Sequence, residues 1–162
     1  MSCKVYWKDS SVQAVPGDAL SATMRKFGAP GSIVRDYASW SVLLRPKQVT
    51  LGSLVLIAKE PVTALPMLSA AAFGELKAIT TDVERVLKQV FDHDKINYLM
   101  LMMVDPDVHF HVIPRFGSAR TFAGREFADP GWPGPPCLDQ ANDTGESVNI
   151  LLRDELIRSW PT

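Results

Sequence analysis

Apolar and polar side chains alternate along DPDVHFHVIPRF, at residues 105–116, and this segment limits the fold more than any other. A period of two is typical of a β-strand, whose successive side chains point to opposite faces. The apolar positions, which we expect to pack into a core, are Val108, Phe110 and Val112. The opposite face then carries Asp107, His109 and His111 in line, with neighbours about 6–7 Å apart. We expect Pro114 to end the strand, because proline has no N–H to donate to a sheet.

Length and composition are those of one globular domain. The chain has 162 residues, enough for a core, and 46% of them are apolar. Its net charge of −1 gives no broad positive surface, so we expect no nucleic-acid partner. No apolar run approaches the roughly 20 residues that span a bilayer, so we expect no membrane association. The N-terminus lacks the apolar core of a signal peptide, and Cys3 and Cys137 have no motif spacing, so we expect free thiols and a cytoplasmic location.

The remaining segments alternate between strand-like and helix-like patterns. In order, we expect a short helix at 18–26, strands at 32–37, 40–45 and 53–59, a helix at 69–91, a strand at 96–103 and, after a short turn, the histidine strand, which runs from Asp107 to Pro114. In the long helix, apolar residues including Phe73 recur at helical spacing behind Ser69 as the N-cap. The strand at 96–103 is almost wholly apolar, which favours a central strand covered on both faces. The very short turn at 104–106 predicts an antiparallel neighbour.

This order of elements predicts the fold class. Strands, one long helix and further strands are typical of an α+β domain with an antiparallel sheet and helices on one face. We expect an N-terminal arm at 1–17, a domain at 18–116, and a Gly/Pro-rich extension at 117–162 that ends in a short helix from about residue 147.

The motif DVHFHVI at 107–113, followed by Pro-Arg, resembles the signature of the histidine triad (HIT) family, in which three histidines alternate with apolar residues. The first histidine of that signature is Asp107 here. The resemblance extends from about residue 20 to residue 115 and includes Gly52 before the third strand. It implies a HIT-like antiparallel sheet of about five strands with a long and a short helix. It also implies a homodimer with a continuous sheet, a small nucleotide substrate and no cofactor.

Family members transfer or hydrolyse nucleotidyl groups through the middle histidine, so the resemblance implies that His109 attacks the α-phosphorus and forms a nucleotidyl-histidine. Imidazole suits this step because a neutral ring nitrogen is nucleophilic at pH 7. The other nitrogen of His109 then needs an acceptor, usually a backbone carbonyl. His111 matches the third histidine, which holds phosphate oxygens and protonates the leaving group. This mechanism needs no metal, although two histidines and an aspartate on one strand could instead bind zinc.

Asp107 is the main departure from the family pattern and is therefore a third candidate catalytic residue. An ionised aspartate accepts hydrogen bonds but cannot donate them. It could accept a proton from His109, raise the pKa of that ring and weaken the nucleophile, or it could contact His111 and keep an acid ready. Alternatively, Asp107 is a turn residue whose side chain takes no part.

Four other residues are candidate substrate contacts. Arg45 stands where many family members have an Asn or Asp that bonds ribose hydroxyls, and a guanidinium suits phosphate or carboxylate instead. Arg115 could supply charge near phosphate. The alternative for Arg45 is an arginine in a surface salt bridge, and for Arg115 a solvated arginine at a strand end. Asn97 either contacts substrate or bonds the backbone at a strand end. Trp132 either stacks on the base or packs against the protein.

Three functions follow from these residues. The first is a nucleotidyl hydrolase or transferase of the HIT type, acting on a dinucleoside polyphosphate, a nucleoside phosphoramidate or a similar small nucleotide. The alternative is a nucleotide-binding HIT-like module with weak or no catalysis, because Asp107 and the absence of a Gln- and Ser/Thr-containing loop have eroded the site. The third is a specialised nucleotidyltransferase whose acceptor is not water.

Overall fold

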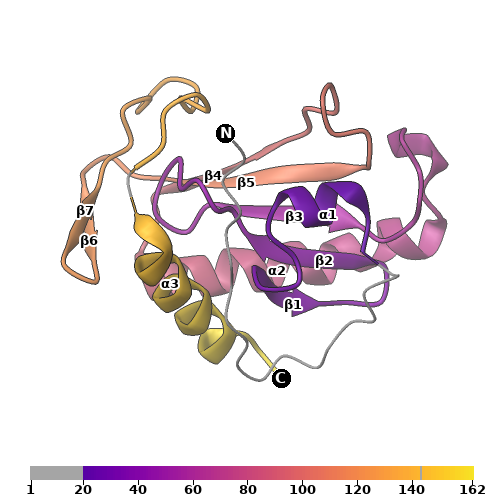
Figure 1. Cartoon of the computed structure of the whole chain (residues 1–162), viewed down its shortest axis with the longest axis horizontal. Helices are drawn as coiled ribbons and strands as arrows, with labels where there is room; N and C mark the ends of the chain where they lie inside the picture. The colour runs from indigo at the N-terminus through magenta and orange to yellow at the C-terminus, as the bar shows by residue number, and fades with distance from the viewer. Residues whose placement is uncertain (1–19, 143) are drawn as a thin grey trace.

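A five-stranded antiparallel sheet forms the centre of the molecule (Figure 1). The computed structural model describes residues 20–142 and 144–162, so the predicted arm at 1–17 and the predicted helix start at residue 18 lie outside the described residues. The sheet order is β1-β2-β3-β5-β4. The strands are β1 (Ile33–Asp36), β2 (Trp40–Leu44), β3 (Leu54–Ala58), β4 (Lys95–Leu99) and β5 (His109–Arg115). The predicted α+β class and antiparallel sheet are confirmed.

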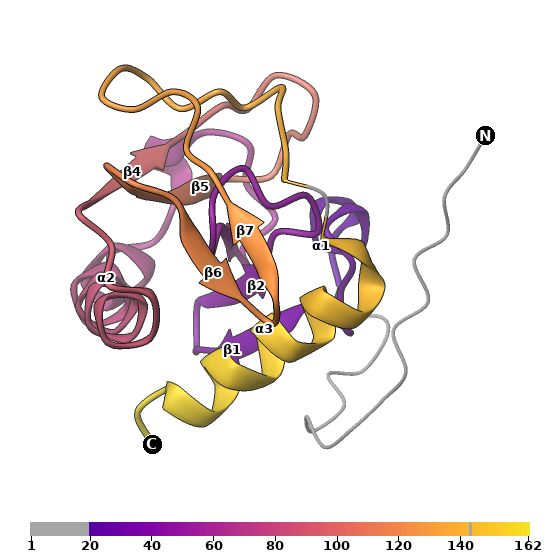
Figure 2. The ribbon, with the colours of Figure 1, turned by 90° about the vertical axis from the view of Figure 1, so that its left-hand side faces the viewer.

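Helices cover both faces of the sheet, not one as predicted (Figure 2). On one face lie α2 (Ala70–Phe91), preceded by the 3₁₀ helix η2 (Leu65–Met67), and α3 (Gly145–Ser159), which packs on α2 and beside β1. On the other face lies the short α1 (Ala22–Lys26). The side chains of a strand alternate between the two faces of the sheet, and here both faces carry buried apolar side chains. Each face therefore needs helices to cover it.

The long helix α2 begins and ends close to its predicted bounds. The hydroxyl of Ser69 accepts a hydrogen bond from the backbone N of Ala72 at 3.1 Å, which confirms the predicted N-cap. Its buried residues face the sheet: Ala72, Ile79, Val83, Val86, Leu87 and Phe91. Phe73 is 42% exposed, so its predicted place in the apolar face is wrong. Residue 73 follows the fully buried Ala72 directly, which turns it about 100° away from the sheet.

The strand predicted at 96–103 is shorter and lies elsewhere in the sheet. β4 forms the edge of the sheet, and most of its residues are half-buried, so the predicted central position is wrong. Residues 100–108 leave the sheet as a connection to β5, longer than the predicted three-residue turn. The expected antiparallel pairing with β5 is confirmed, with Leu99 opposite His111 and Lys95 opposite Arg115. The apolar run marked a β-strand but did not show how many neighbours it has.

β5 lies between β3 and the edge strand β4, and it continues through Pro114 instead of ending there. Just before it, the carbonyl of Val108 accepts a hydrogen bond from the N–H of Ala58, so even-numbered residues direct their backbone groups toward β3. The β3 pairing ends opposite Val112. The nitrogen of Pro114 therefore points past the end of β3, where a missing N–H costs no ladder bond.

The Gly/Pro-rich extension contains more structure than predicted. Strands β6 (Arg120–Phe122) and β7 (Arg125–Phe127) form a hairpin whose turn residues, Ala123 and Gly124, both have positive φ. Phe127 is buried in the core beneath it. The predicted terminal helix is confirmed as α3. Within the part of the chain that is described, no helix is long and apolar enough to cross a bilayer.

Candidate active site

Two histidine rings meet on the sheet face that α1 covers. The ring centroids of His109 and His111 lie 5.1 Å apart and the rings stand edge to face. Phe27, at the end of α1, packs its ring 6.1 Å from His109 and 5.8 Å from His111. Both histidines are buried, His109 fully. The two-residue spacing on β5 thus places both imidazoles under an aromatic cover, shielded from bulk water.

The hydrogen bonding of His109 selects one tautomer. Its Nδ1 lies 2.7 Å from the backbone carbonyl oxygen of Asp107. A carbonyl only accepts, so Nδ1 carries the proton and Nε2 keeps its lone pair. Nε2 is buried and has no hydrogen-bond partner among the described residues. In the neutral ring the lone pair is therefore on Nε2, the nitrogen that would attack an electrophile.

The carboxylate of Asp107 contacts neither histidine by a hydrogen bond in the described residues. Its Oδ2 accepts from the backbone N of Thr23 at 3.3 Å, and the hydroxyl of Ser21 hydrogen-bonds to it as well. Burial raises the pKa of Asp107, but the bonds from Thr23 and Ser21 outweigh it, so the net pKa lies below its usual value. The Asp107 side chain thus anchors the first turn of α1 to the start of β5.

His111 is neutral at physiological pH. Burial is the main cause that lowers its pKa to about 4, and the nearby charge of Arg45 acts in the same direction. Its Nδ1 is buried and has no partner in the described residues. Asp105 opposes the shift, but its carboxylate is bound by the Lys26 ammonium at 2.6 and 2.9 Å. An anion next to His111 would favour the protonated ring, so its charge depends on what occupies the site.

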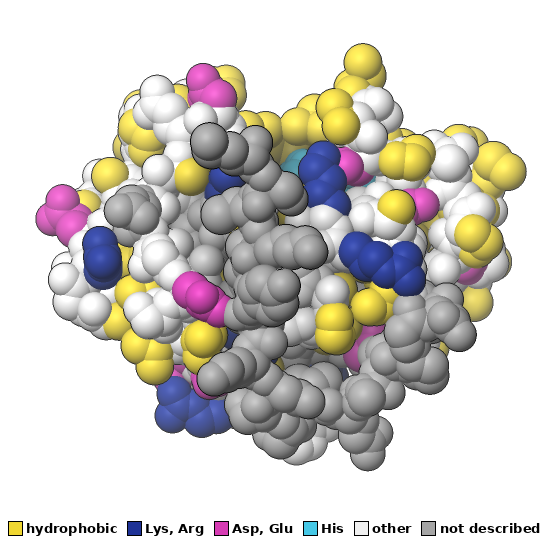
Figure 3. Space-filling model, in the orientation of Figure 1, with side chains coloured by type: hydrophobic (Ala, Val, Ile, Leu, Met, Phe, Trp, Pro, Cys, Tyr) yellow, Lys and Arg dark blue, Asp and Glu magenta, His cyan; other side chains and the backbone are white. Residues whose placement is uncertain are grey.

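Arg45 lies on the same face as the histidines. In the sheet, Leu43, Val55 and His111 form one row across β2, β3 and β5. Arg45 is two residues beyond Leu43, and its backbone N–H donates to the carbonyl of Ser53, so the pairing of β2 with β3 continues to this residue. Because side chains two residues apart on a strand share a face, Arg45 projects from the histidine face. In Figure 3, cyan histidine surface is visible beside dark blue and magenta side chains on this side of the molecule.

The predicted contacts Asn97 and Arg115 lie at the other end of β5. Arg115 is six residues from His109, about 20 Å along an extended strand. Its guanidinium pairs with both oxygens of Asp129 at 2.7 and 3.1 Å and also binds the side-chain oxygen of Asn97 at 2.7 Å. These contacts give both side chains a structural role, and their substrate contacts stay predictions. The buried Arg115–Asp129 pair fastens the C-terminal extension to the sheet.

Trp132 also lies beyond the end of β5. Its indole borders Gly117, where an added Cβ would stand 3.4 Å from the ring, and 38% of Trp132 is exposed. Of the two predictions for this residue, packing against the protein is the one that the structure supports. Trp132 lies beyond the Arg115 end of β5, whereas His109 is at the other end, so the length of the strand lies between them. The indole therefore cannot stack on a base that is held beside His109 of the same chain.

Sequence reasoning missed the residues of α1 that complete the site. Leu20, Met24 and Phe27 are buried against Ile33, Leu43, Val55 and Ile57 on the histidine face. Their spacing of four and three residues is the signal of an amphipathic helix and was visible in the sequence. The contact of Thr23 with Asp107, 84 residues away, had no local signal.

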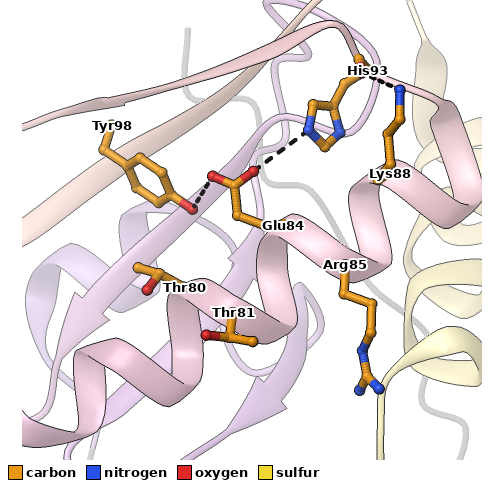
Figure 4. A pocket seen from close by; sticks show the side chains of 7 residues that line it. All are labelled: Thr80, Thr81, Glu84, Arg85, Lys88, His93 and Tyr98. Carbon is orange, nitrogen blue, oxygen red and sulfur yellow. Dashed lines mark hydrogen bonds and ion pairs between the residues drawn. The ribbon is translucent and has the colours of Figure 1, made fainter.

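A hollow lies on the opposite face, between α2 and β4 (Figure 4). Glu84 accepts from the hydroxyl of Tyr98 at 3.3 Å and lies 3.6 Å from Nε2 of His93, while Lys88 donates to the His93 carbonyl. Tyr98 is opposite Val112, whose side chain belongs to the core under α2. This hollow is therefore separated from His109 by the sheet. Its lining residues are Thr80, Thr81, Glu84, Arg85, Lys88, His93 and Tyr98.

The zinc alternative has no support in the described residues, where no three side chains of the His, Cys, Asp and Glu types group as a metal site would need. Cys137 is a free cysteine, as expected, whereas Cys3 lies outside the described residues.

Comparison with known proteins places the chain among histidine-triad folds. The family model described as "HIT domain" matches residues 30–118. A histidine triad protein from Bradyrhizobium japonicum is 22% identical, with 87% of this chain and 96% of that one covered and a TM-score of 0.65. A histidine triad (HIT) protein from Sinorhizobium meliloti is 20% identical, with coverages of 86% and 95% and a TM-score of 0.68. No curated protein matches the chain. At these identities the solved structures support the fold alone.

Proposed function

This chain belongs to the HIT domain family, and from that premise we propose that it is a nucleotidyl hydrolase or transferase working through a nucleotidyl-histidine on His109. The family as a whole consists of nucleotide-binding hydrolases and transferases. The observation that carries the proposal for this chain is the bond between Nδ1 of His109 and the Asp107 carbonyl, which leaves a buried, unprotonated Nε2. The proposed substrates are dinucleoside polyphosphates, nucleoside phosphoramidates or similar small nucleotides.

The reaction proceeds in two displacements. Nε2 of His109 attacks the α-phosphorus, a P–N bond forms, and the bond from phosphorus to the leaving group breaks. Water or another acceptor then attacks the same phosphorus, gives up its proton, and breaks the P–N bond, which restores His109. His111 binds a phosphate oxygen, and the anionic phosphate raises the pKa of its ring, so that it can supply a proton to the leaving group.

Asp107 supports this chemistry through its backbone. The carbonyl that orients His109 is present whatever side chain residue 107 carries, so replacing the family's first histidine by aspartate leaves the nucleophile's tautomer unchanged. The carboxylate instead fastens α1, whose Phe27 covers both rings. Asp107 is accordingly a positioning residue in this proposal.

Trapping of the covalent adduct tests the proposal. Full-length protein is mixed with labelled diadenosine tetraphosphate and, separately, labelled adenosine phosphoramidate, then quenched in alkali, in which a phosphohistidine survives. We expect a labelled adduct in the wild type and in His93→Ala, whose histidine lies on the other face of the sheet, and none in His109→Ala. An adduct that persists in folded His109→Ala would refute the assignment.

The second candidate, a nucleotide-binding module without efficient catalysis, rests on the same departure at residue 107. It predicts that calorimetry detects AMP or GMP binding while no polyphosphate is turned over. The variant Asp107→His separates the two candidates, because a large gain in rate would mean that aspartate had eroded an active site. A transferase with a different acceptor would instead show turnover only when that acceptor is added.

We also propose a homodimer joined through β4. This strand is the sheet edge, with no strand on its outer side in the described residues, and an open edge can pair with a second copy. Light scattering with size-exclusion chromatography measures the mass, and a monomer at micromolar concentration would contradict this. The cytoplasmic location stays a prediction.

A further inference from the structure

Arg45 is a half-buried cation without a counter-ion among the described residues. One terminal nitrogen donates to the carbonyl of Lys47, and no carboxylate of residues 20–142 or 144–162 contacts the group. Its Nε is buried and has no hydrogen-bond partner in the part of the chain that is described. Burial also lowers the pKa of Arg45, as expected for a charge withdrawn from water. A guanidinium held in this way is stabilised strongly by any anion that reaches it.

The carboxylates on this side of the sheet are already engaged. Asp105 is bound by Lys26, and Asp107 accepts from Thr23 and Ser21. Neither is positioned as a partner of Arg45 by any hydrogen bond or ion pair. The described residues therefore supply no anion to neutralise Arg45, and a ligand could do so.

The position of Arg45 relative to His111 is suited to a ligand that reaches both. Their Cα atoms are two strands and two residues apart in register, a separation of about 12 Å. Both side chains project from the same face, and the arginine's charge is close enough to lower the pKa of His111. A substrate whose phosphorus is attacked by His109 thus has Arg45 to one side of its reacting group.

We propose that Arg45 binds a second anionic group of the substrate, distinct from the phosphoryl group that His109 attacks, and so selects nucleotides that carry an additional phosphate. This inference rests on the proposed nucleotide substrate and specifies its class. A guanidinium donates but cannot accept, so it favours an oxyanion over hydroxyl groups that also need an acceptor. The additional phosphate is carried either on the sugar or on the phosphate chain.

Binding without turnover tests this inference. Calorimetry on the full chain carrying His109→Ala compares AMP with adenosine 3′,5′-bisphosphate, which has the second phosphate on the sugar, and with ADP, which has it on the chain. We expect at least one of the two to bind about tenfold or more tightly than AMP, as a charge-assisted bond to a buried guanidinium would give. The preferred ligand identifies which source of the phosphate Arg45 recognises.

Variants of Arg45 connect the preference to this side chain. In Arg45→Gln the ratio of affinities between the preferred ligand and AMP should fall to about twofold or less, and Arg45→Lys should keep part of this ratio because the charge remains but the fork is lost. Lys47→Gln removes an exposed charge two residues away and should keep the full preference. Equal affinities for all three ligands, or an unchanged preference in Arg45→Gln or Arg45→Lys, would overturn the inference.

The two proposals fail in different ways. AMP binding without a preference for the additional phosphate removes the inference about Arg45 and leaves the proposed function intact. A phosphate preference that depends on Arg45, together with no adduct on His109, removes the catalytic proposal and keeps the inference. No binding of any of the three ligands counts against both.

Discussion

The backbone carbonyl of Asp107 holds Nδ1 of His109 at 2.7 Å, while the carboxylate of the same residue holds the backbone N of Thr23 at 3.3 Å. One residue thus connects the strand that carries His109 to the helix that covers it. The backbone part of this connection does not depend on the side chain, whereas the helix anchor does. Substitutions at residue 107 can therefore separate the two.

Replacing the Asp107 side chain should affect stability more than chemistry. Asp107→Ala removes the acceptor for the first turn of α1, and we expect the free energy of unfolding to fall by about 1 kcal/mol. Asp107→Asn keeps an acceptor oxygen and should cost less. Both keep the carbonyl that orients His109, so adduct formation should stay within about tenfold of wild type. Urea denaturation and adduct trapping measure the two effects. Loss of the adduct in folded Asp107→Ala, as complete as in His109→Ala, would show that the carboxylate itself takes part.

The lowered pKa of His111 predicts a dependence of stability on pH. The folded protein keeps this ring neutral down to about pH 4, whereas the unfolded chain protonates it near pH 6.5. Between these values the unfolded state binds more protons, so the free energy of unfolding falls as the pH is lowered through this window, by at most ~1.4 kcal/mol per pH unit. Above pH 6.5 this contribution is constant.

Urea denaturation at pH 5.0, 6.0 and 7.5 checks this slope. In His111→Gln the free energy of unfolding should depend less steeply on pH, because the contribution of His111 is gone. His93→Gln, on the other face of the sheet, should keep that contribution. A slope that is the same in wild type and His111→Gln would contradict the assignment. A bound phosphate-containing ligand should reduce the slope, because its charge raises the pKa of the His111 ring.

The sequence predicted the histidine strand well because a period of two is a local property. Each side chain of β5 has its face set by its immediate neighbours, so the pairing of His109 with His111 needed no knowledge of the fold. The Ser69 cap of α2 was predictable for the same reason. Contacts between distant segments were not: nothing near Asp107 indicates that Thr23 binds its carboxylate, and nothing near Arg115 indicates Asp129.

Strand position in the sheet was also beyond local patterns. The apolar run from Ile96 onward marks a β-strand, but its place at the edge depends on β5 inserting between β3 and β4. Arg115 lies at the far end of β5 because six residues of extended strand separate it from His109, a distance that the spacing alone gives. Its pairing with Asp129 depends on where the C-terminal extension folds, which no local pattern near Arg115 indicates.

The Arg115–Asp129 pair should matter far more to stability than an exposed ion pair. Their side chains are only 5% and 1% exposed, and breaking a buried pair leaves an uncompensated charge, which costs about 3–5 kcal/mol. We expect Asp129→Ala to lower the free energy of unfolding by that amount in urea denaturation. Glu155→Ala breaks the exposed Arg158–Glu155 pair and should cost less than about 1 kcal/mol. A loss below 1 kcal/mol in Asp129→Ala would mean that the pair does not fasten the extension.

Two glycines give a matched test of the packing between the β2–β3 loop and α2. Gly52 has φ of +80°, and a Cβ there would lie 2.6 Å from the ring of Phe91, so Gly52→Ala should destabilise the fold by more than about 1 kcal/mol. Gly74 lies in α2 with nothing within 4 Å of an added Cβ, so Gly74→Ala should stabilise by about 0.5–1 kcal/mol. Thermal or urea denaturation of both variants measures the difference. If Gly52→Ala is as stable as wild type, then Phe91 does not close on the loop as the structure has it, and the helix end is not held against the sheet at this point.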